Sequence, residues 1–455
     1  MKLRGKKVLV VGLGKTGEAV CNFLLARGAE VKVSDKKNAK ELGPKISFWK
    51  KKGITVETGE HRLHSFQEVD LIIPSPGVPP ITPLQKAAEK GVKIISEIEL
   101  ASKFLKGKIV GITGSNGKST TATLTHKILK EGGLAAYLAG NIGIPLISFI
   151  HNSRDQDIYI TEISSFQLQY IEHFKADLAV LLNISPDHLN WHPSFTDYYQ
   201  AKTKLITFQD KMATAILNRD DPLVWNLRPQ IKSKVYAFSQ KKKVHPGCFL
   251  QNQWLIISNS GQTRLMSASQ IPLLGSHNLE NVMAAALIGY LFSIPTERIS
   301  QSIKSFKGLE HRLEWVTSIR GVDFYNDSKA TNVDAALKSI QSFRVKIVLI
   351  LGGRDKGGDF TKLRKAIQER AKKIIVIGEA AEKIKNSLKD TVPIKEVSSL
   401  KGAAAASFEA AQPGEVVLLA PACTSFDMFH NFEERGQIFK KEVLALQRKI
   451  EEVKT

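Results

Sequence analysis

The stretch GITGSNGKSTTATLTHKIL, residues 111–129, decides the fold class of this chain. It reads as the end of a buried strand, a glycine-rich turn and the start of a helix. Gly114 and Gly117 let the backbone turn, so that several N–H groups point toward an anion at the helix N-terminus. Lys118 can reach the outer phosphates of a nucleotide, and Ser119 can ligate Mg²⁺. The stretch therefore predicts an α/β fold that binds ATP or GTP.

The match to the generic phosphate-loop pattern G-x-x-x-x-G-K-[ST] is imperfect. Ile112 stands five residues before Gly117, and the outer glycine is Gly111, one place earlier. An ordinary glycine turn in front of a helix is therefore the alternative. The order of a strand, Gly-Lys-Ser and an amphipathic helix favours the phosphate loop.

Length and charge limit the class of protein. At a typical length of about 150 residues per domain, a chain of 455 residues is expected to have about three domains. The 65 Lys and Arg residues against 44 Asp and Glu residues give a net charge of +21, which favours anionic partners. Because the basic residues are scattered and not gathered into one arm, we expect a solvated, lysine-rich surface and no nucleic-acid partner.

The cysteine content indicates a reducing compartment, and the hydropathy gives no sign of a membrane span. Cys21, Cys248 and Cys423 are an odd number without close spacing, so neither a disulfide framework nor a zinc knuckle is indicated. No apolar stretch is long enough to span a bilayer. We therefore expect a cytoplasmic protein without stable membrane insertion.

Short apolar runs alternate with helix-like stretches in three segments, which is typical of parallel sheets covered by helices. Residues 1–96 contain KVLVVGL, AEVKVSD, DLIIPSPG and VKIISE, and residues 97–307 contain IVGIT, YITEI, LAVLLNI and TAILN. Residues 308–455 start with the hairpin-like EWVTSIRGVDFYND and continue with KIVLILGG, KIIVIGE and EVVLLAPA. The sequence predicts three α/β domains with these boundaries.

The composition changes between about residues 232 and 272. Here VYAFS, CFLQNQWLIISNSG and TRLMSAS are short, alternating and separated by turns, and they resemble antiparallel strands. We expect a small antiparallel addition to the central domain.

The N-terminal run VLVVGLGKTGEAV contains G-x-G-x-x-G at Gly12, Gly14 and Gly17, directly after a predicted strand. Asp35 ends the next strand, where a ribose-binding acid is expected. This geometry accepts any nucleoside diphosphate, so the fingerprint alone does not indicate NAD. The alternative is a strand-to-helix turn in which Asp35 caps a helix.

Polar residues also stand near strands of the predicted central sheet. Glu162 ends the apolar strand of IYITEISSFQL, where a carboxylate could hold Mg²⁺. Asp187 and His188 follow LAVLLNI at the same sheet edge, and the histidine could be a metal ligand. Taken singly, Glu162 could be an exposed strand end, His188 a polar loop residue and Lys202 in YYQAKTKL a solvated helical lysine.

Three polar loops follow strands of the last segment. FYNDSKATN contains Asp327 and Lys329, and LGGRDKGGDF places Lys356 in a glycine-rich loop. Each could be an anion site or an ordinary strand-to-helix turn. PACTSFDMFHNFEERG adds Ser425 and Phe432. Polar loops that each follow a strand are what a cleft between α/β domains requires.

Taken together and in this order, these motifs resemble the Mur ligase family over nearly the whole chain. They are GLGKTG, SPGVP, SEIEL, GITGSNGKST, GNIG, TEISSFQL, SPDHLNWH, YYQAKTKL, SHNLENVMAA, HRLE, NDSKATN, GGRDKGGDF and PACTSFDMFHNFEERG. The displaced outer glycine of the phosphate loop is normal in that family. Within the family, the resemblance is to the branch that adds D-glutamate to UDP-N-acetylmuramoyl-L-alanine in cytoplasmic peptidoglycan precursor synthesis.

The resemblance implies a fold and a reaction. The fold would be a Rossmann-like N-terminal domain for the UDP end of the substrate, a central P-loop ATPase-like α/β domain, and a Rossmann-like C-terminal domain for the amino acid. The substrate carboxylate would attack the γ-phosphate of ATP to give an acyl phosphate. The amine would then displace phosphate through a tetrahedral intermediate. The enzyme would be a monomer that uses ATP and two Mg²⁺ ions.

The resemblance also implies roles for single residues. The catalytic residues would be Lys118, Glu162, His188 and a carbamylated Lys202, and the metal ligands would be Ser119, Glu162, His188 and that modified Lys202. The ATP-binding positions would be Gly114, Ser115, Asn116, Gly117, Lys118, Ser119, Thr120, Asn278, Asn281, Arg312, Asp327 and Lys329. The UDP-sugar would meet Lys15, Thr16, Asp35, Gly77, Asn141 and His188. D-glutamate would meet Thr331, Lys356, Ser425 and Phe432, with Lys356 as the cation for its side-chain carboxylate.

Two residues depart from the family pattern. Lys15 stands where an apolar residue is common, and Arg354 adds a positive charge beside Lys356.

Other functions remain as alternatives to this one. A sibling ligase for L-alanine or a diamino acid would differ in the C-terminal loops, and folylpolyglutamate synthetase has its phosphate loop near the N-terminus. A nicotinamide-dependent dehydrogenase would leave Lys118 and Glu162 unexplained. A nucleic-acid-stimulated ATPase would need no amino acid.

Overall fold

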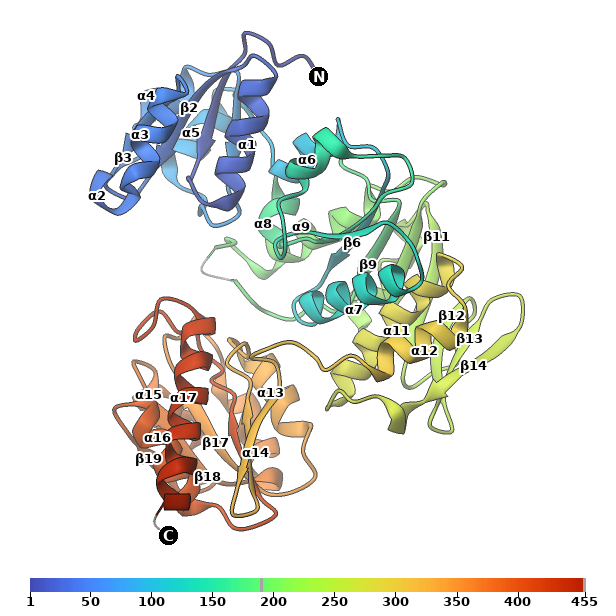
Figure 1. Cartoon of the computed structure of the whole chain (residues 1–455), viewed down its shortest axis with the longest axis vertical. Coiled ribbons are helices and arrows are strands. Elements are labelled where there is room, and N and C mark those ends of the chain that lie inside the picture. The colour runs from blue at the N-terminus through green and yellow to red at the C-terminus, as the bar shows by residue number, and fades with distance from the viewer. Residues whose placement is uncertain (189–190, 453–455) are drawn as a thin grey trace. The chain divides into compact units, whose positions relative to one another are not determined.

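The computed structural model describes residues 1–188 and 191–452 as an α/β chain with three β-sheets (Figure 1). The chain forms two compact units. The first contains residues 1–184, 191–266 and 281–302, and the second contains the described residues of 185–190, 267–280 and 303–455. The predicted boundaries after residues 96 and 307 are not decided by this division and stay predictions.

The first unit begins with a five-stranded sheet in the order β3-β2-β1-β4-β5, and all its neighbouring strands are parallel. Its strands are β1 Lys7–Val11, β2 Glu30–Asp35, β3 Thr55–Thr58, β4 Leu71–Pro74 and β5 Lys93–Ile94. Its helices are α1 Lys15–Ala26, α2 Ala39–Leu42, α3 Pro44–Lys51, α4 Leu63–Gln67 and α5 Thr82–Glu89. Strand β1 is buried from Val8 to Val11, as expected for a strand covered on both faces.

The second sheet of this unit has nine strands in the order β14-β13-β12-β11-β10-β9-β6-β8-β7. They are β6 Lys108–Thr113, β7 Ala136–Gly140, β8 Ile158–Glu162, β9 Leu178–Leu181, β10 Thr214–Asn218, β11 Lys234–Ser239, β12 Gly247–Gln251, β13 Trp254–Ser258 and β14 Gln262–Ser267. The other helices of this unit are α6 Glu97–Ser102, α7 Lys118–Glu131, α8 Ser165–Gln169, α9 Phe195–Thr207 and α10 Pro222–Trp225, with 3₁₀ helices η1 Leu146–Asn152 and η2 Arg228–Gln230. Helices α11 Ser276–Leu291 and α12 Thr296–Lys304 belong partly to each unit, and the 3₁₀ helix η3 Ala268–Gln270 belongs to the second. Helix α7 packs on β6, β7 and β8, and α9 packs on β6 and β9 (Figure 1).

The predicted antiparallel addition is only partly correct. Strands β12 and β13 are antiparallel, with Leu250 opposite Leu255. Strand β11, which contains VYAFS, is instead parallel to both β10 and β12. Its five buried or half-buried residues VYAFS continue the core of the parallel sheet, so it belongs to the main sheet and not to the hairpin.

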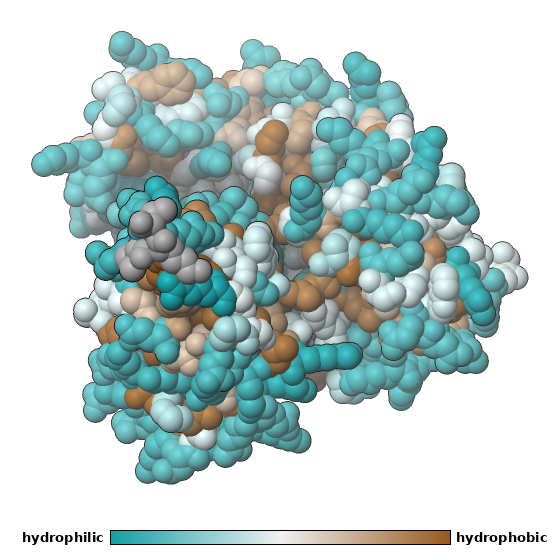
Figure 2. Space-filling model, turned by 60° about the horizontal axis from the view of Figure 1, so that its bottom comes forward, coloured by the Kyte–Doolittle hydropathy of each residue, from teal (hydrophilic) through white to brown (hydrophobic). Residues whose placement is uncertain are grey.

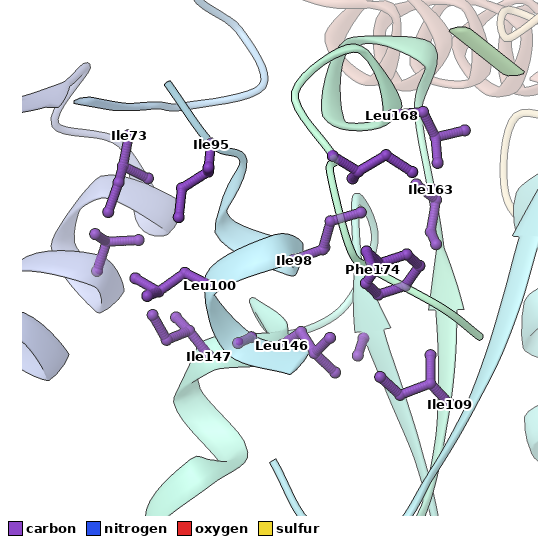
Figure 3. Close-up of a cluster of buried hydrophobic side chains, with 14 of the residues drawn as sticks. Ile73, Ile95, Ile98, Leu100, Ile109, Leu146, Ile147, Ile163, Leu168 and Phe174 are labelled. Carbon is purple, nitrogen blue, oxygen red and sulfur yellow. The ribbon is translucent and has the colours of Figure 1, made fainter. Parts of the chain in front are cut away.

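A hydrophobic cluster runs from the first sheet to the second through α6 and η1 (Figure 3). Ile73 belongs to β4, Leu100 to α6 and Ile147 to η1, and Figure 3 shows these side chains on the same side of the cluster. Ile98, from the same helix, is directed toward Phe174 (Figure 3). Burial of each such side chain contributes about 1.5–3 kcal/mol, so α6 is held firmly against both sheets.

The second unit contains a six-stranded sheet in the order β15-β16-β20-β17-β18-β19. Its strands are β15 Glu314–Ile319, β16 Val322–Asn326, β17 Ile347–Gly352, β18 Ala371–Ile377, β19 Ile394–Glu396 and β20 Val416–Leu419. Its helices are α13 Val333–Gln341, α14 Arg364–Arg370, α15 Ala381–Leu388, α16 Leu400–Ala410 and α17 Phe432–Glu452, with 3₁₀ helix η4 Phe360–Leu363. The predicted hairpin is confirmed, because β15 and β16 are antiparallel, and the other neighbouring strands are parallel.

The surface shown in Figure 2 is largely hydrophilic, as expected for a solvated protein. On the face shown in Figure 2, hydrophilic side chains predominate and hydrophobic residues form smaller groups. Many of the lysines form single ion pairs with acids, such as Lys6 with Asp70 at 3.0 Å. Within the residues described, no helix combines the length and apolar character that crossing a membrane requires.

Candidate active site

The predicted phosphate loop lies between β6 and α7, at the carboxyl ends of the parallel strands. Gly117 is the N-cap of α7 and has a φ of 87°, which favours glycine. A Cβ atom at this position would lie 2.2 Å from Oδ1 of Asn281. Asn281 also accepts a hydrogen bond from the Thr121 hydroxyl at 3.3 Å. The structure therefore brings Asn281, a predicted ATP-binding residue, against the phosphate loop.

Side chains from neighbouring strands and helices hold this loop in place. The Asn116 N–H donates to Oδ1 of Asn183 at 2.9 Å, and Nδ2 of Asn183 donates to the Asn116 carbonyl at 3.1 Å. Ser115 Oγ and the Tyr198 hydroxyl form a hydrogen bond of 2.7 Å. The sequence analysis missed Asn183 and Tyr198. Their positions in the sequence could have indicated them, because Asn183 follows β9 and Tyr198 precedes Lys202 by one helical turn.

Lys118 is the first residue of α7 and reaches back across the loop. Its Nζ donates to the carbonyl oxygens of Gly114 and Ser115, both at 2.8 Å. Ser119 and Thr120, in the same first turn, are buried. A helix N-terminus with these groups is suited to bind phosphate, because its N–H groups and dipole favour negative charge.

Glu162 lies at the end of β8, next to the phosphate loop. It is paired with Ile112 of β6 on one side and Gly140 of β7 on the other. Its Oε1 accepts a hydrogen bond from Nδ2 of Asn141 at 2.9 Å, whereas its Oε2 is buried without a hydrogen-bond partner among the residues that the structure describes. The side chain is therefore not an exposed strand end. Because an unpaired buried carboxylate oxygen is costly, this atom fits a cation.

Lys202 lies on α9 and is 1% exposed, so it is not a solvated helical lysine. Its Nζ donates to the Gly114 carbonyl at 2.8 Å and lies 5.0 Å from the centre of the Tyr198 ring. His192 lies near it and is hydrogen-bonded to Ser165 Oγ at 2.9 Å. Burial and the Lys202 charge lower the pKa of His192 to about 4. Lys202 and His192 thus form a buried polar cluster next to the predicted phosphate loop.

Within 1–188 and 191–452, no three His, Cys, Asp or Glu side chains are grouped so that they could hold an ion by themselves. The donors beside the phosphate loop are instead one carboxylate, from Glu162, and the hydroxyl of Ser119. Such a donor set is typical of Mg²⁺ that is bound with the phosphates of a nucleotide.

A second pocket, of about 480 Å³, lies at the carboxyl ends of β1 and β2. Five of the six residues predicted to bind the UDP-sugar line it: Lys15, Thr16, Asp35, Gly77 and Asn141. The sixth, His188, belongs to the other unit. The pocket also contains Lys36, Lys37, Lys45 and His61, which the sequence analysis missed. The run SDKK, in which two lysines directly follow Asp35, could have indicated the first two.

Asp35 holds the glycine-rich loop of this pocket. Its carboxylate accepts the Leu13 N–H at 2.6 Å and the Lys37 N–H at 2.8 Å. The loop glycines are needed for close packing, since a Cβ at Gly17 would lie 2.0 Å from the Gly12 carbonyl oxygen. The Asp35 side chain therefore fixes the loop backbone by hydrogen bonds, and it is also a candidate to bind the UDP-sugar.

The second unit has its own pocket, of about 250 Å³, at the carboxyl ends of its parallel strands. His188, Thr331 and Lys356 line it, and Ser425 and Phe432 do not. Lys356 Nζ lies 3.7 Å from Oδ1 of Asp187, whose Oδ2 accepts a hydrogen bond from Asn332 at 3.0 Å. Asp187 and Asn332 were not among the predicted binding residues. His188 has a φ of 55°, which is uncommon for residues other than glycine.

Other predicted positions of the second unit lie in the neighbouring loops. Ser425 is buried, and Lys329 Nζ lies 3.6 Å from the centre of the Phe432 ring. Arg354 is exposed and donates to both carboxylate oxygens of Glu379, at 2.8 and 2.9 Å. The additional charge that the sequence placed beside Lys356 is therefore neutralised by Glu379.

The remaining candidates for ATP binding in the second unit are Asn278, Arg312 and Asp327. Nδ2 of Asn278 donates to the Leu274 carbonyl at 2.8 Å. Asp327 is buried and accepts a hydrogen bond from the Ser339 hydroxyl. Burial raises the pKa of Asp327 to about 6, and the charge of Arg312 acts in the opposite direction. A carboxylate held this way is a strong acceptor at neutral pH, when it is ionised.

Three family models match successive parts of the chain. They are the Mur ligase MurD-like N-terminal domain over residues 6–96, the Mur ligase middle domain over 112–289, and the Mur ligase glutamate ligase domain over 311–423. Similar proteins cover almost the full length. A UDP-N-acetylmuramoylalanine--D-glutamate ligase from Koribacter versatilis is 45% identical, over 97% of this chain and 98% of its own. The ligase of the same name from Acidobacterium capsulatum is 46% identical, over 98% and 97%.

Solved structures share the fold at low sequence identity. UDP-N-acetylmuramate-alanine ligase from Thermotoga maritima aligns with a TM-score of 0.60 at 18% identity, over 97% of this chain and 99% of that one. MurF ligase from the same organism, solved in complex with ADP, aligns with a TM-score of 0.59 at 17% identity, over 98% and 96%. At this identity the likeness concerns the fold.

Proposed function

Because the chain belongs to the Mur ligase family, we propose that it is the ATP-dependent ligase that joins D-glutamate to UDP-N-acetylmuramoyl-L-alanine, releasing ADP and phosphate. The family is ATP-dependent. The observation that carries the proposal is the arrangement beside β6. A phosphate loop, a buried carboxylate with one unpaired oxygen and a buried lysine meet at one sheet edge, in a chain that is 45% identical over nearly its whole length to a ligase of this name.

The first step requires two anions, a carboxylate and a triphosphate, to approach each other. In our proposal, the loop N–H groups and Lys118 hold the β- and γ-phosphates of ATP, with Asn281 against the loop. These groups are fixed before the reaction by Asn183 and Tyr198, so little reorganisation is needed when charge develops on the transferred phosphoryl group. The substrate carboxylate attacks the γ-phosphorus, the bond from that phosphorus to the β–γ bridging oxygen breaks, and ADP leaves.

Mg²⁺ fits this site, and we propose that Ser119 and the unpaired oxygen of Glu162 hold it. When bound, the ion would supply positive charge that offsets the phosphate charge. The roles of His188 and Lys202 at a second ion follow from the family, with Lys202 acting as a carbamate. A carbamate forms when a neutral amine adds to CO₂ and loses a proton. The 1% exposure of Lys202 supports this role.

We assign the UDP-sugar to the pocket of the first sheet. The glycine-rich loop between β1 and α1 permits close approach of a pyrophosphate. Lys15, Lys36, Lys37 and Lys45 supply positive charge along the pocket, and Asn141 links it to Glu162 through its side-chain hydrogen bond. The basic lining suits a diphosphate better than a neutral sugar alone.

We assign the amino acid to the second unit. Thr331 and Lys356 line its pocket, Ser425 lies in the loop after β20, and Phe432 is the first residue of α17. Lys356 would exchange its 3.7 Å pairing with Asp187 for the side-chain carboxylate of D-glutamate. The amine of this amino acid attacks the acyl carbon, loses a proton, and phosphate leaves through a tetrahedral intermediate. We further propose that the protein acts as a monomer in the cytoplasm, where its nucleotide substrates are made.

The experiment is phosphate release from ATP and Mg²⁺ with UDP-N-acetylmuramoyl-L-alanine. It compares D-glutamate with L-glutamate, L-lysine, meso-diaminopimelate and no amino acid. Release with D-glutamate alone, with a matching nucleotide-peptide product by mass spectrometry, is the expected result. Release with another amino acid would keep the ligase chemistry and contradict the substrate. If a folded protein that binds ATP released no phosphate with any of these amino acids, the proposed function would be contradicted.

A further inference from the structure

Arg435 is a buried cation that the proposed reaction does not use. It lies in the first turn of α17 and is 2% exposed. Its Nε donates to Ser328 Oγ at 2.9 Å, and its Nη2 donates to the Ser328 carbonyl at 2.8 Å and the Cys423 carbonyl at 3.1 Å. Its Nη1 donates to the Thr424 carbonyl at 3.1 Å and makes a longer contact of 3.5 Å with the Gly352 carbonyl.

The acceptors belong to three separate loops at one edge of the sheet. Ser328 follows β16, Gly352 ends β17, and Cys423 and Thr424 follow β20. These strands are neighbours in the order β16-β20-β17, so their loops lie next to one another. The same loops continue directly to the residues assigned to the amino acid, namely Thr331, Lys356 and Ser425. One guanidinium group thus ties together three of the four chain segments that line this pocket; the fourth contains residues 185–188.

The loop backbone is shaped around the guanidinium. Gly353 has a φ of 129°, and a Cβ at this position would lie 3.0 Å from Nη1 of Arg435 and 2.1 Å from the Thr424 carbonyl oxygen. Only glycine allows the β17 loop to pass this close. The five oxygens that the Arg435 N–H groups contact are all neutral, and the charge of Asp427 favours the ionised form of Arg435.

Such a group is expensive to bury and hard to replace. Burial lowers the pKa of Arg435 to about 10, so the side chain stays charged at neutral pH. A lysine keeps the charge but lacks the planar fork that donates in three directions at once. Burying a guanidinium without a paired carboxylate costs stability unless its hydrogen bonds are complete.

We propose that Arg435 is a positioning residue for the incoming amino acid: its guanidinium fixes the three loops that carry Thr331, Lys356 and Ser425, and so sets the affinity for this substrate without touching it. The inference rests on the assignment of the amino acid to this pocket. It concerns the second unit alone, so the UDP-sugar pocket of the first unit is unaffected.

The test measures steady-state kinetics of Arg435→Lys, Arg435→Gln and the wild type. The varied substrate is the amino acid that supports phosphate release by the wild type. We expect Arg435→Lys to raise KM for the amino acid by about tenfold or more, because small misplacements of binding groups carry costs of this size. KM for UDP-N-acetylmuramoyl-L-alanine should stay within about twofold, since the first unit keeps its geometry. Arg435→Gln should raise the amino-acid KM further.

Arg364→Lys is the matched control. Arg364 also donates to backbone carbonyls, those of Ser387 and Lys389 at 3.0 Å each, but these lie away from the three loops. The Arg364→Lys substitution should lower thermal stability without changing the KM for the amino acid or the KM for UDP-N-acetylmuramoyl-L-alanine. Ser328→Ala removes the Nε acceptor together with the hydrogen bond that Ser328 Oγ donates to the Phe432 carbonyl at 2.8 Å, but it keeps the guanidinium. It provides a milder variant, should Arg435→Gln not fold.

Hydrogen–deuterium exchange gives a readout that does not depend on activity. Arg435→Lys should increase exchange in residues 328–331, 352–358 and 423–428 together, and leave 364–389 unchanged. An unchanged amino-acid KM in Arg435→Lys, or an equal rise in both KM values, would overturn the proposal. So would exchange that rises uniformly through the unit, because this would indicate a general loss of stability.

Discussion

Asn141 and Glu162 are joined by a hydrogen bond of 2.9 Å that uses only one oxygen of the carboxylate. The other oxygen is buried and has no hydrogen-bond partner within residues 1–188 and 191–452. Asn141 also lines the pocket assigned to the UDP-sugar, whereas Glu162 lies beside the phosphate loop. This pair therefore connects the two sites of the first unit, with the free oxygen of Glu162 available for a cation.

Glu162→Gln should lower turnover and raise the Mg²⁺ concentration needed for half-maximal rate. The variant keeps the size of the side chain and one oxygen for Asn141, but it removes the negative charge. We expect a loss of kcat of about 10²-fold or more, as for other single electrostatic groups at an active site. The measurement is phosphate release over a range of Mg²⁺ concentrations.

Asp157→Asn is the matched control for this variant. Asp157 is a buried acid immediately before the same strand, where it accepts hydrogen bonds from the Arg154 N–H and the Tyr159 hydroxyl. Its substitution should affect stability and leave the Mg²⁺ dependence unchanged. A wild-type Mg²⁺ profile in Glu162→Gln would show that the unpaired oxygen does not hold the ion.

Lys118→Ala should abolish most of the ligation, because the transferred phosphoryl group loses its cation. A loss of about 10²–10³-fold in kcat is expected for removal of one such donor. Lys127→Ala, on the same helix and paired with Glu131 at the surface, should behave as the wild type. Both are compared by steady-state kinetics with ATP. Near-normal turnover of Lys118→Ala would count against the whole assignment of the phosphate site.

Lys202→Ala should be nearly inactive and should regain activity with an added small carboxylate such as formate. The added anion would occupy the space left by the carbamate and restore its negative charge, whereas a free lysine amine could not be replaced in this way. Lys204→Ala is the control, because Lys204 lies on the same helix and donates to the Gln169 carbonyl at 3.0 Å. Full activity of Lys202→Ala without any additive would remove the carbamate role.

Much of the fold could be predicted from local patterns. The glycine-rich turn before Lys118, the strand ending at Glu162 and the hairpin at residues 314–326 all follow from hydrophobic runs bounded by turns. The α/β fold class and the resemblance to the Mur ligase family are confirmed by the family models and by relatives of the same length. Strands β3, β7 and β19 were not predicted, because they are short or partly exposed edge strands with weak hydrophobic signals.

The candidate site was less predictable than the fold. Sequence spacing could indicate Lys118 and Glu162, since each stands at the end of a recognisable strand or loop. It could not show that Asn183 and Tyr198 hold the loop, or that Glu379 neutralises Arg354, because these contacts join residues far apart in the chain. The direction of β11 was predicted wrongly for a similar reason. Strand direction depends on which neighbour a strand pairs with, and the hydrophobic pattern of VYAFS suits either direction.

Glu97 offers a test of buried charge outside the site. It begins α6 within the hydrophobic cluster of Figure 3, is 1% exposed, and accepts the Ile147 N–H at 2.6 Å. Burial raises the pKa of Glu97 from its usual value of 4.5 to about 7. The native state therefore binds this proton more tightly than the unfolded state does. The stability that the group contributes is complete below about pH 4.5 and is lost as the pH rises through about 7.

Glu97→Gln keeps the side chain neutral at every pH, so it should remove this dependence. The free energy of unfolding of the wild type, measured relative to the variant, should fall by about 3 kcal/mol between pH 4.5 and pH 8, at 1.36 kcal/mol for each unit of pKa shift. Urea unfolding of both proteins at several pH values measures this difference. Glu89→Gln, at an exposed position at the end of α5, is the control and should follow the wild type. A difference between wild type and Glu97→Gln that stays constant from pH 4.5 to 8 would contradict the prediction, because it would mean that Glu97 titrates alike in the folded and unfolded states.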